Sequence, residues 1–242
     1  MTNRIMVPKG KTITHSFDLW GVIIDTGKMG PVKLRAYDMA APALGLPDAE
    51  HAQAREDYEA LCRGEAYARA NKGPIIARVE GRIAEAEGSG LISVDYDAAF
   101  PDVLMQDGVA ALEKVLSLGY HPIIFSSGDA PWVRRNLPEG MGLHLGNIYS
   151  ASKPDGKSVP EAFDRVYAVE MGLDHQVVSH TEDDLGALVA AMASGHFSPQ
   201  NLVFVARNAK VSAEHVREAG IGQYTGDLRE IDYASMAEYG QD

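Results

Sequence analysis

The sequence predicts an α/β fold, in which a parallel sheet is covered by helices on both faces and interrupted by a helical insert. Apolar runs typical of buried strands recur along the chain, and helical segments separate them. These runs lie at residues 15–24, 121–128, 176–180 and 201–206. Strands that alternate with helices favour a parallel sheet, and ligands of such sheets bind beyond the carboxyl ends of the strands.

The first run ends in an acidic residue that is placed for chemistry. Asp18 closes the apolar approach, and Gly21 follows three residues later. Glycine lets the chain turn tightly, so the Asp18 side chain is expected to face a crevice at the carboxyl tip of a buried strand. A lone aspartate after a strand is more often a turn or cap residue. The other segments decide between these two interpretations.

The stretch between Lys28 and Asp102 differs from the rest of the chain. It is rich in Ala, Glu and Arg at helical spacing, and it contains no clear strand. We predict amphipathic helices over 49–70 and 74–87, with breaks at 88–90 and 100–101. The expected organisation is a core domain of residues 1–27 plus 103–242 and a helical cap domain of residues 28–102. An ordinary helical layer packed on the sheet is the alternative.

The second half of the chain continues the alternation of helices and strands. A helix is predicted over 108–118, because its apolar residues fall on one face. These residues are Val109, Leu112, Val115 and Leu116. Residues 210–220 have a helical pattern, and the last twenty residues have the composition of a polar tail.

Composition limits the classes of function. The chain has 242 residues, with 34 acidic and 22 basic side chains and a formal net charge of −12. This charge argues against binding to nucleic acid or to an anionic membrane, but a pocket can still bind a small anionic substrate. The single cysteine, Cys62, allows no internal disulfide and fits a cytoplasmic protein. No run reaches the roughly 18–20 apolar residues that span a bilayer. The oligomeric state is left open.

The segment from Phe17 to Asp25 resembles the first motif, DxDG[TV], of the haloacid dehalogenase (HAD) superfamily. It is closest to the FDLDGVI of the β-phosphoglucomutase-like branch. The resemblance implies a hydrolase with a Rossmann-like core and a helical cap, in which Asp18 is the nucleophile and forms a covalent aspartyl intermediate. Trp20 stands where most phosphatase members carry a second aspartate, the general acid/base. Indole has no titratable proton near neutral pH, so Trp20 cannot take that role.

Two further segments resemble family motifs. Ser126 ends an apolar strand, as in the second motif, whose hydroxyl binds a substrate oxygen; Ser127 beside it is expected on the substrate side. Lys157 begins a segment similar to K-P-x-P-[DE]-x-F, with Ser158 in place of the first proline. The resemblance implies that Lys157 neutralises the repulsion between the nucleophile and an anionic substrate. Residues 153–155 form a rival register.

The acid pair Glu182 and Asp183 begins a stretch, residues 182–195, that resembles the family's E-D-S-x-x-G-h-x-A-A-x-A-A-G. The resemblance implies that this pair and Asp18 bind Mg²⁺, a hard cation that prefers oxygen ligands. In a competing register, Ser179, Thr181 and Asp184 match the S-x-N-x-x-D of true dehalogenases. That register does not place the alanines and the glycine, and it ranks second.

Three other side chains are candidates for the site. Lys33 and Arg35, early in the helical insert, could meet a substrate anion, although such residues are usually solvated. His180 lies beside the acid pair, and its ordinary pKa of about 6.5 suits an acid/base that replaces the missing aspartate. The alternative for His180 is a structural histidine at the end of a strand.

Three functions follow from this pattern. A Mg²⁺-dependent hydrolase of a small phosphorylated metabolite is favoured by the retained Glu182–Asp183 pair. A 2-haloacid dehalogenase or phosphonate hydrolase is favoured by Trp20, because family members with these activities lack the second aspartate. The third is a metabolite-binding module with weakened chemistry.

Overall fold

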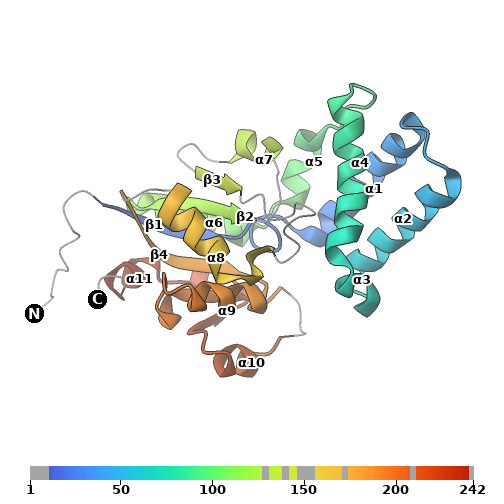
Figure 1. Ribbon diagram of the computed structural model, residues 1–242. Helices are drawn as coiled ribbons and strands as arrows, with labels where there is room; N and C mark the ends of the chain where they lie inside the picture. Colours follow the sequence, from blue (N-terminus) through green and yellow to red (C-terminus); the bar gives the residue numbers. More distant parts are fainter. Residues whose placement is uncertain are drawn as a thin grey trace, which may run out of the picture. The chain divides into compact units, whose positions relative to one another are not determined.

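The computed structural model describes residues 11–126, 131–137, 142–145, 156–170, 174–207 and 211–239. Within these ranges the chain forms a six-stranded sheet, in the order β3-β2-β1-β4-β5-β6, with helices on both sides (Figure 1). Each neighbouring pair of strands is parallel. The parallel α/β fold expected from the sequence is therefore confirmed.

The strands place their carboxyl ends at one edge of the sheet. Their bounds are β1 Thr12–Phe17, β2 His121–Ser126, β3 Gly142–Leu145, β4 His175–Glu182, β5 Leu202–Val205 and β6 Gln223–Thr225. β1 is central and pairs with β2 and β4, so Phe17 lies opposite Ile124 and Thr181. The carboxyl ends of β1, β2 and β4 therefore meet at this edge. The short strands β3 and β6 lie outside the runs predicted from the sequence.

The first predicted strand is shorter than its apolar run. β1 ends at Phe17, and residues 19–24 form a buried turn instead of more strand. The amides of Ile23 and Ile24 donate to the Leu19 carbonyl, over 3.0 and 2.8 Å, and Gly21 N donates to Ile24 O over 2.8 Å. The run is apolar because the turn is buried, so apolar character alone could not distinguish it from a strand.

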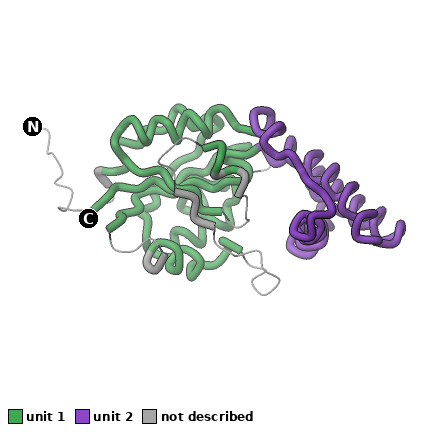
Figure 2. Tube along the Cα trace, turned by 90° about the horizontal axis from the view of Figure 1, so that it is seen from above, with its two compact units in different colours: residues 1–24, 104–148, 155–242 green, residues 25–103, 149–154 purple. Residues whose placement is uncertain are grey.

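The chain divides into two compact units, which are described separately (Figure 2). Of the described residues, 25–103 form a helical unit, and the remainder form the unit that contains the sheet. The helical unit consists of α1 Thr26–Ala43, α2 Asp48–Cys62, α3 Ala66–Ala70, α4 Lys72–Gly88 and α5 Tyr96–Val103. Its own apolar core includes Tyr37, Ala60, Val79 and Ile83.

Two details of the helical unit correct the sequence prediction. The helix predicted over 49–70 is broken into α2 and α3 at Gly64, whose φ is 73°. The break predicted at 100–101 is wrong, because Phe100 and Pro101 lie inside α5. Phe100 and Val103 are buried there, and their packing outweighs the one hydrogen bond that a proline removes.

In the sheet unit, short helices cover the two faces of the sheet. They are α6 Gln106–Ser117, α7 Pro131–Asn136, η1 Gly156–Ser158, α8 Pro160–Phe163, η2 Asp164–Glu170, α9 Leu185–Ala193, η3 Pro199–Asn201, α10 Ala213–Glu218, η4 Leu228–Glu230 and α11 Tyr233–Tyr239. α8, η2 and α9 share one apolar core with the sheet residues Ile123, Phe125 and Phe204. This packing holds the segment from η1 to α8, and with it Lys157, against the sheet.

The polar tail expected for the last twenty residues is wrong for residues 223–239. This stretch contains β6, η4 and α11, and Tyr233, Met236 and Ala237 are buried. Their spacing of three and four residues gives α11 one apolar face, which its polar neighbours obscure in the sequence.

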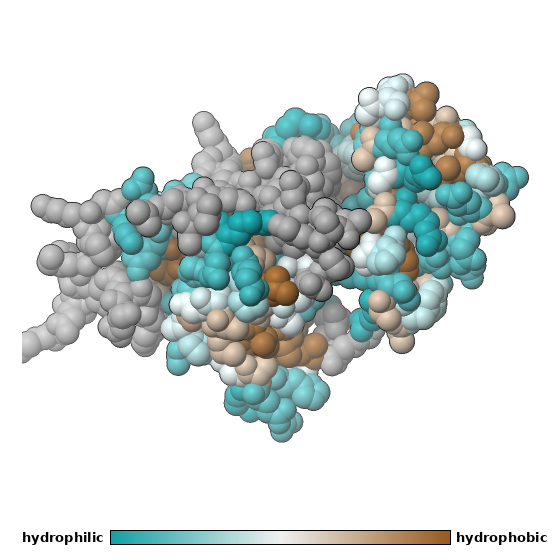
Figure 3. Space-filling model, in the orientation of Figure 1, coloured by the Kyte–Doolittle hydropathy of each residue, from teal (hydrophilic) through white to brown (hydrophobic). Residues whose placement is uncertain are grey.

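On the face shown in Figure 3, small apolar areas are scattered among hydrophilic ones. None of the helices among the described residues is long and apolar enough to cross a membrane.

Candidate active site

A buried lysine lies at the carboxyl edge of the central strands. The Lys157 ammonium forms ion pairs with Asp18, which follows β1, and with Glu182, the last residue of β4. It also donates to the Phe125 carbonyl in β2 over 3.2 Å. All three charged residues are buried: Asp18 is 5% exposed, Lys157 is 6% exposed and Glu182 is 2% exposed. Three segments distant in sequence thus meet around one ammonium group.

Burial and charge both act on the ionisation of this cluster. Burial raises the pKa of Asp18 to about 6, and the Glu182 carboxylate adds to this effect, whereas Lys157 opposes it. Burial also raises the pKa of Asp183 well above its ordinary value, with Glu182 and Asp18 adding to the rise. Burial would lower the pKa of Lys157, but Asp18 and Glu182 outweigh it and raise that pKa. Lys157 is therefore charged, and its single positive charge is shared by the carboxyl groups of Asp18, Glu182 and Asp183.

The backbone around the acid pair fits tightly against the turn after β1. Glu182 Oε1 accepts hydrogen bonds from the amides of Asp183 and Asp184, over 3.1 and 3.3 Å. Gly21 has a φ of 82°, and a Cβ built on it would lie 2.2 Å from Asp183 Oδ2. Glycine at position 21 thus permits both the turn and the approach of the Asp183 carboxylate.

No family model and no curated protein matches the sequence. Solved structures match it at low identity. A protein provisionally assigned as a β-phosphoglucomutase, from Bacteroides vulgatus, is 13% identical and matches with a TM-score of 0.52 over 96% of this chain and 90% of its own. A HAD hydrolase of family IA, variant 3, from Entamoeba histolytica is 14% identical, with a TM-score of 0.51 over 96% of this chain and 100% of its own.

A third structure is that of YfnB from Bacillus subtilis, provisionally assigned as a HAD hydrolase and bound to magnesium. It is 14% identical, with a TM-score of 0.50 over 91% of this chain and 96% of its own. This chain has a HAD-like fold. At these identities the likeness concerns the fold, so the chemistry is argued from the residues themselves.

The acid cluster of this HAD fold suits a divalent cation. Asp18, Glu182 and Asp183 each offer a carboxylate oxygen, and these oxygens lie within 4.8 Å of one another. When all three are ionised, the Lys157 ammonium leaves two negative charges uncompensated in a buried place. Burial is the main cause of the raised pKa values of Asp18 and Asp183, and the neighbouring carboxylates add to both. A hard dication with oxygen ligands such as Mg²⁺ matches both the donor atoms and the charge.

The structure places the other predicted site residues as follows. Ser126 is fully buried at the end of β2, beside β1. Trp20 lies in the turn after Asp18, partly exposed, and its backbone forms a bridge with Ile24. Ser127 and the rival register at 153–155 lie outside the described residues. Of the competing dehalogenase register, Ser179 hydrogen-bonds to His15 over 2.7 Å, and Asp184 caps the N-terminus of α9.

His180 belongs to a buried polar network beside the acid pair. Its Nδ1 lies 3.0 Å from Ser16 Oγ, which in turn lies 2.6 Å from the Tyr167 hydroxyl. Its Nε2 lies 3.6 Å from Glu182 Oε2. Burial, with Lys157 adding, holds the pKa of His180 well below 6.5, so the ring is neutral. A neutral ring within this buried network fits the structural histidine expected as the alternative.

Lys33 and Arg35 have different surroundings within the helical unit. Lys33 forms an ion pair with Glu80 of α4, an arrangement that stabilises the packing of α1 on α4. Arg35 is exposed and lines an open pocket of about 560 Å³ between α1 and α5, together with Lys28 and Asp102. Lys33 is thus paired within the helical unit, whereas Arg35 faces this pocket.

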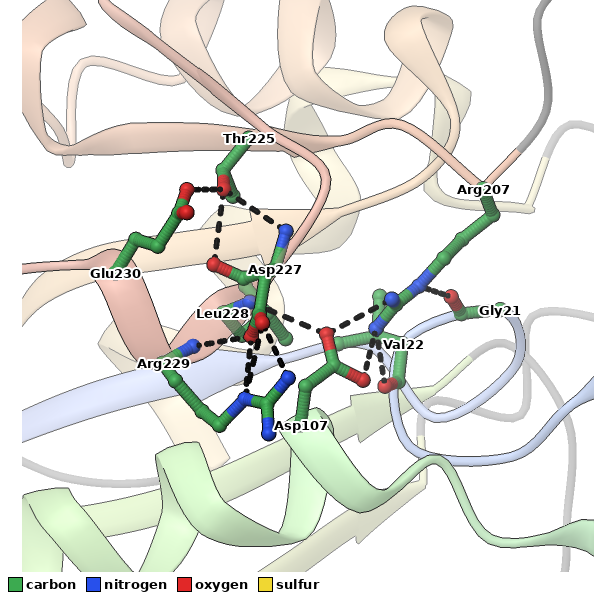
Figure 4. A network of polar contacts seen from close by, with 9 residues as sticks. All are labelled: Gly21, Val22, Asp107, Arg207, Thr225, Asp227, Leu228, Arg229 and Glu230. Carbon is green, nitrogen blue, oxygen red and sulfur yellow. Dashed lines mark hydrogen bonds and ion pairs between the residues drawn. The ribbon is translucent and has the colours of Figure 1, made fainter.

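Sequence reasoning missed an arginine and an aspartate that hold the turn after Asp18. Arg207, just after β5, donates to the Gly21 carbonyl over 2.9 Å and to the Val22 carbonyl over 3.2 Å (Figure 4). Asp107, in the first turn of α6, pairs with both terminal nitrogens of Arg207. A single basic residue after an apolar strand gives no signal of such a contact in one sequence.

Proposed function

We propose that this chain is a HAD-type hydrolase that cleaves a small phosphorylated metabolite through a covalent intermediate on Asp18, with Mg²⁺ bound by Asp18, Glu182 and Asp183. The observation that carries the proposal is the buried Lys157 ammonium between Asp18 and Glu182, at the carboxyl ends of β1 and β4. A charge cluster of this kind is costly to bury for stability alone, and it is typical of active sites.

Each residue has a defined task in this reaction. An Asp18 oxygen attacks phosphorus, the bond from phosphorus to the leaving oxygen breaks, and water then hydrolyses the aspartyl phosphate. Lys157 reduces the repulsion between the Asp18 carboxylate and the anionic substrate, and Ser126 offers a hydroxyl to a phosphoryl oxygen. Bound Mg²⁺ would supply further charge stabilisation to the phosphoryl oxygens. Residues 25–103 act as a cap that selects the substrate.

Trp20 narrows the class of phosphorylated substrate. An alkoxide leaves slowly unless an acid protonates it, and Trp20 offers no such acid. Substrates whose leaving group is stable as an anion, such as acyl, enol or aryl phosphates, need less help. We therefore expect turnover to rise steeply as the pKa of the leaving group falls.

Trp20 also supports a second candidate, dehalogenase-type chemistry. Halide leaves without a proton, and in that reaction Asp18 would attack carbon and form an ester, which water hydrolyses. The carboxylate excess around Lys157 argues for the metal-dependent phosphatase, because the resembling dehalogenases work without metal.

A substrate panel tests the proposal. Phosphoesters, phosphonates and 2-haloacids are offered to the wild type and to Asp18→Asn, each with Mg²⁺ and with EDTA. We expect turnover of aryl and acyl phosphates by the wild type with Mg²⁺, and its loss both in EDTA and in Asp18→Asn. Asp184→Asn is the matched control, because Asp184 caps α9 and is outside the three-carboxylate cluster.

Two results would overturn the proposal. Halide release that persists in EDTA would establish the dehalogenase alternative. Absence of turnover in every class, together with binding of a metabolite that raises the melting temperature, would establish the binding module.

A further inference from the structure

The turn that follows the candidate nucleophile is held from outside by one guanidinium group. Arg207 Nε donates to the Gly21 carbonyl over 2.9 Å, and Nη2 donates to the Val22 carbonyl over 3.2 Å. Figure 4 shows the guanidinium reaching across to these two consecutive carbonyls. Residues 19–24 begin directly after Asp18, so the position of this turn sets the path of the chain on both sides of Trp20.

Asp107 fixes the orientation of the Arg207 guanidinium. Its carboxylate accepts from Nη1 and Nη2 of Arg207 over 2.8 and 3.1 Å, and it also accepts from the Leu228 amide over 3.1 Å. The side chains of Arg207 and Asp107 are only 14 and 13% exposed. A two-pronged pair of this kind constrains direction as well as distance, which a lysine cannot do.

The remaining contacts leave the turn little freedom. The Met105 amide donates to the Ile23 carbonyl over 2.9 Å. A Cβ on Gly108 of α6 would lie 2.4 Å from the Val22 carbonyl oxygen, and one on Gly21 would overlap Asp183. The turn is thus packed between the start of α6 and the acid pair, and Arg207 supplies hydrogen bonds to its Gly21 and Val22 carbonyls.

We propose that Arg207, oriented by Asp107, is a positioning residue that fixes the turn 19–24 and thereby the placement of Asp18 and Trp20 for the reaction. Its importance for turnover rests on the function proposed above, whereas its hold on the turn does not. It acts through the backbone and not on the reacting atoms.

The test uses Trp20 as a reporter. The only other tryptophan, Trp132, is replaced by Phe, so that all tryptophan fluorescence comes from Trp20. Arg207→Lys keeps the charge but can serve only one carbonyl at a time. Arg229→Lys is the matched control, because Arg229 pairs with Asp227 in the same region (Figure 4). Circular dichroism, quenching of Trp20 by acrylamide, Mg²⁺ affinity, kcat and KM are measured for each variant.

We expect Arg207→Lys to fold, to expose Trp20 more strongly to acrylamide and to bind Mg²⁺ more weakly. Its kcat is expected to fall by about 10- to 100-fold with a smaller change in KM, because small displacements of reacting groups have effects of this size. Arg229→Lys is expected to give the same values as the protein that carries Trp132→Phe alone. Asp107→Asn, which keeps Arg207 and weakens its anchor, is expected to change each quantity in the same direction to a smaller extent.

If Arg207→Lys does not fold, Asp107→Asn tests in its place whether Arg207 fixes the turn. Folded variants with unchanged Trp20 quenching would overturn the proposal, even if turnover falls. Altered quenching with unchanged kcat would show that the turn moves without consequence, which also overturns it. If the parent is inert on every substrate, the proposed function fails, and the quenching and Mg²⁺ measurements alone then decide whether Arg207 holds the turn.

Discussion

Gly21 occupies a position that leaves no room for a side chain. Its φ of 82° is one that residues with a side chain seldom adopt, and the Asp183 carboxylate occupies the place of a Cβ. Gly45, between α1 and α2, has a similar φ of 71° but has open space around its Cβ position. A comparison of Gly21 with Gly45 therefore separates the cost of backbone strain from the cost of displacing the Asp183 carboxylate.

We expect Gly45→Ala to lower the free energy of unfolding by about 1–2 kcal/mol, the usual strain of a left-handed residue with a side chain. Gly21→Ala should lower it by more, because Asp183 must also move, and it should weaken Mg²⁺ binding. Urea denaturation and Mg²⁺ titration check both effects. Equal losses of stability and equal Mg²⁺ affinities in the two variants would show that the close approach of Asp183 is unimportant.

Trp20 is the residue that separates this chain from the phosphatase motif. Trp20→Asp supplies a carboxyl group two residues after the nucleophile. We expect hydrolysis of alkyl phosphates to rise by about 10-fold or more, and the dependence of rate on the leaving group to weaken, because general acid catalysis has effects of this size. Circular dichroism first establishes that the variant folds. A folded variant with no gain on any phosphoester would contradict the role assigned to this position.

The sequence predicted the position of single residues only where a motif surrounded them. The motif favours Lys157 over the register at 153–155, because Pro160, Glu161 and Phe163 follow Lys157 in the order of the motif, and the structure places Lys157 beside Asp18 and Glu182. Arg207 and Asp107 have no such surroundings. Their pairing depends on how α6 and β5 meet in space, and one sequence does not contain that information.

The central strands β1 and β4 carry polar side chains inside the sheet unit. Thr14, His15 and Ser16 in β1 and Ser179, His180 and Thr181 in β4 are all fully buried. His15 lies opposite Ser179, and its Nδ1 is 2.7 Å from the Ser179 hydroxyl. Burial lowers the pKa of His15 from 6.5 to about 4, so the folded protein keeps this ring neutral.

This histidine makes stability depend on pH in a defined direction. Between pH 6.5 and 4 the unfolded chain binds a proton at His15 that the folded chain excludes, so the stability contributed by His15 is complete above pH 6.5 and is lost as the pH falls. The loss approaches about 3 kcal/mol at pH 4.

His15→Asn removes this titration while keeping a hydrogen-bonding group near Ser179. The wild type should therefore be more stable than the variant at pH 7, and the difference should shrink by about 3 kcal/mol on going to pH 4. Urea denaturation at a series of pH values measures it, and other groups that titrate cancel in the comparison. A difference that stays constant over this range would contradict the neutral, buried state of His15.

At the scale of elements, the order of strands and helices followed from apolar runs, but their limits did not. The turn at 19–24 is as apolar as a strand because it is buried, and α11 has too few apolar residues to stand out in a polar segment. Both depend on what packs against them, and local periodicity does not record this.

The molecule as a whole is acidic, and the two buried acids among the described residues, Asp18 and Glu182, lie together with Asp183. The formal net charge is −12, and the oxygens of Asp18, Glu182 and Asp183 lie within 4.8 Å of one another. A cation bound there stabilises the folded state and not the unfolded chain, because only the fold brings these oxygens together. The division into a sheet unit and a helical insert was suggested by the change of pattern at residue 28, but the partners of the insert's charged residues were not, as the Lys33–Glu80 pair shows.

We expect Mg²⁺ to raise the melting temperature. At about 100 times its dissociation constant, such a ligand adds about 2.7 kcal/mol, and each kcal/mol corresponds to about 2–4 °C for a chain of this size. Asp183→Asn should abolish the shift, whereas Asp184→Asn should retain it. Thermal unfolding with Mg²⁺ and with EDTA measures this, and a shift that survives in Asp183→Asn would place the ion elsewhere.

The central claim is that Asp18 becomes covalently linked to the phosphoryl group. The most direct measurement is rapid acid quenching of the wild type during turnover of an aryl or acyl phosphate with Mg²⁺, followed by mass spectrometry of the peptide that contains Asp18. We expect this peptide to gain the mass of one phosphoryl group and to lose it with hydroxylamine, and we expect Asp18→Asn never to acquire it. Turnover without a modified peptide, or a phosphoryl group on any other residue, would contradict it.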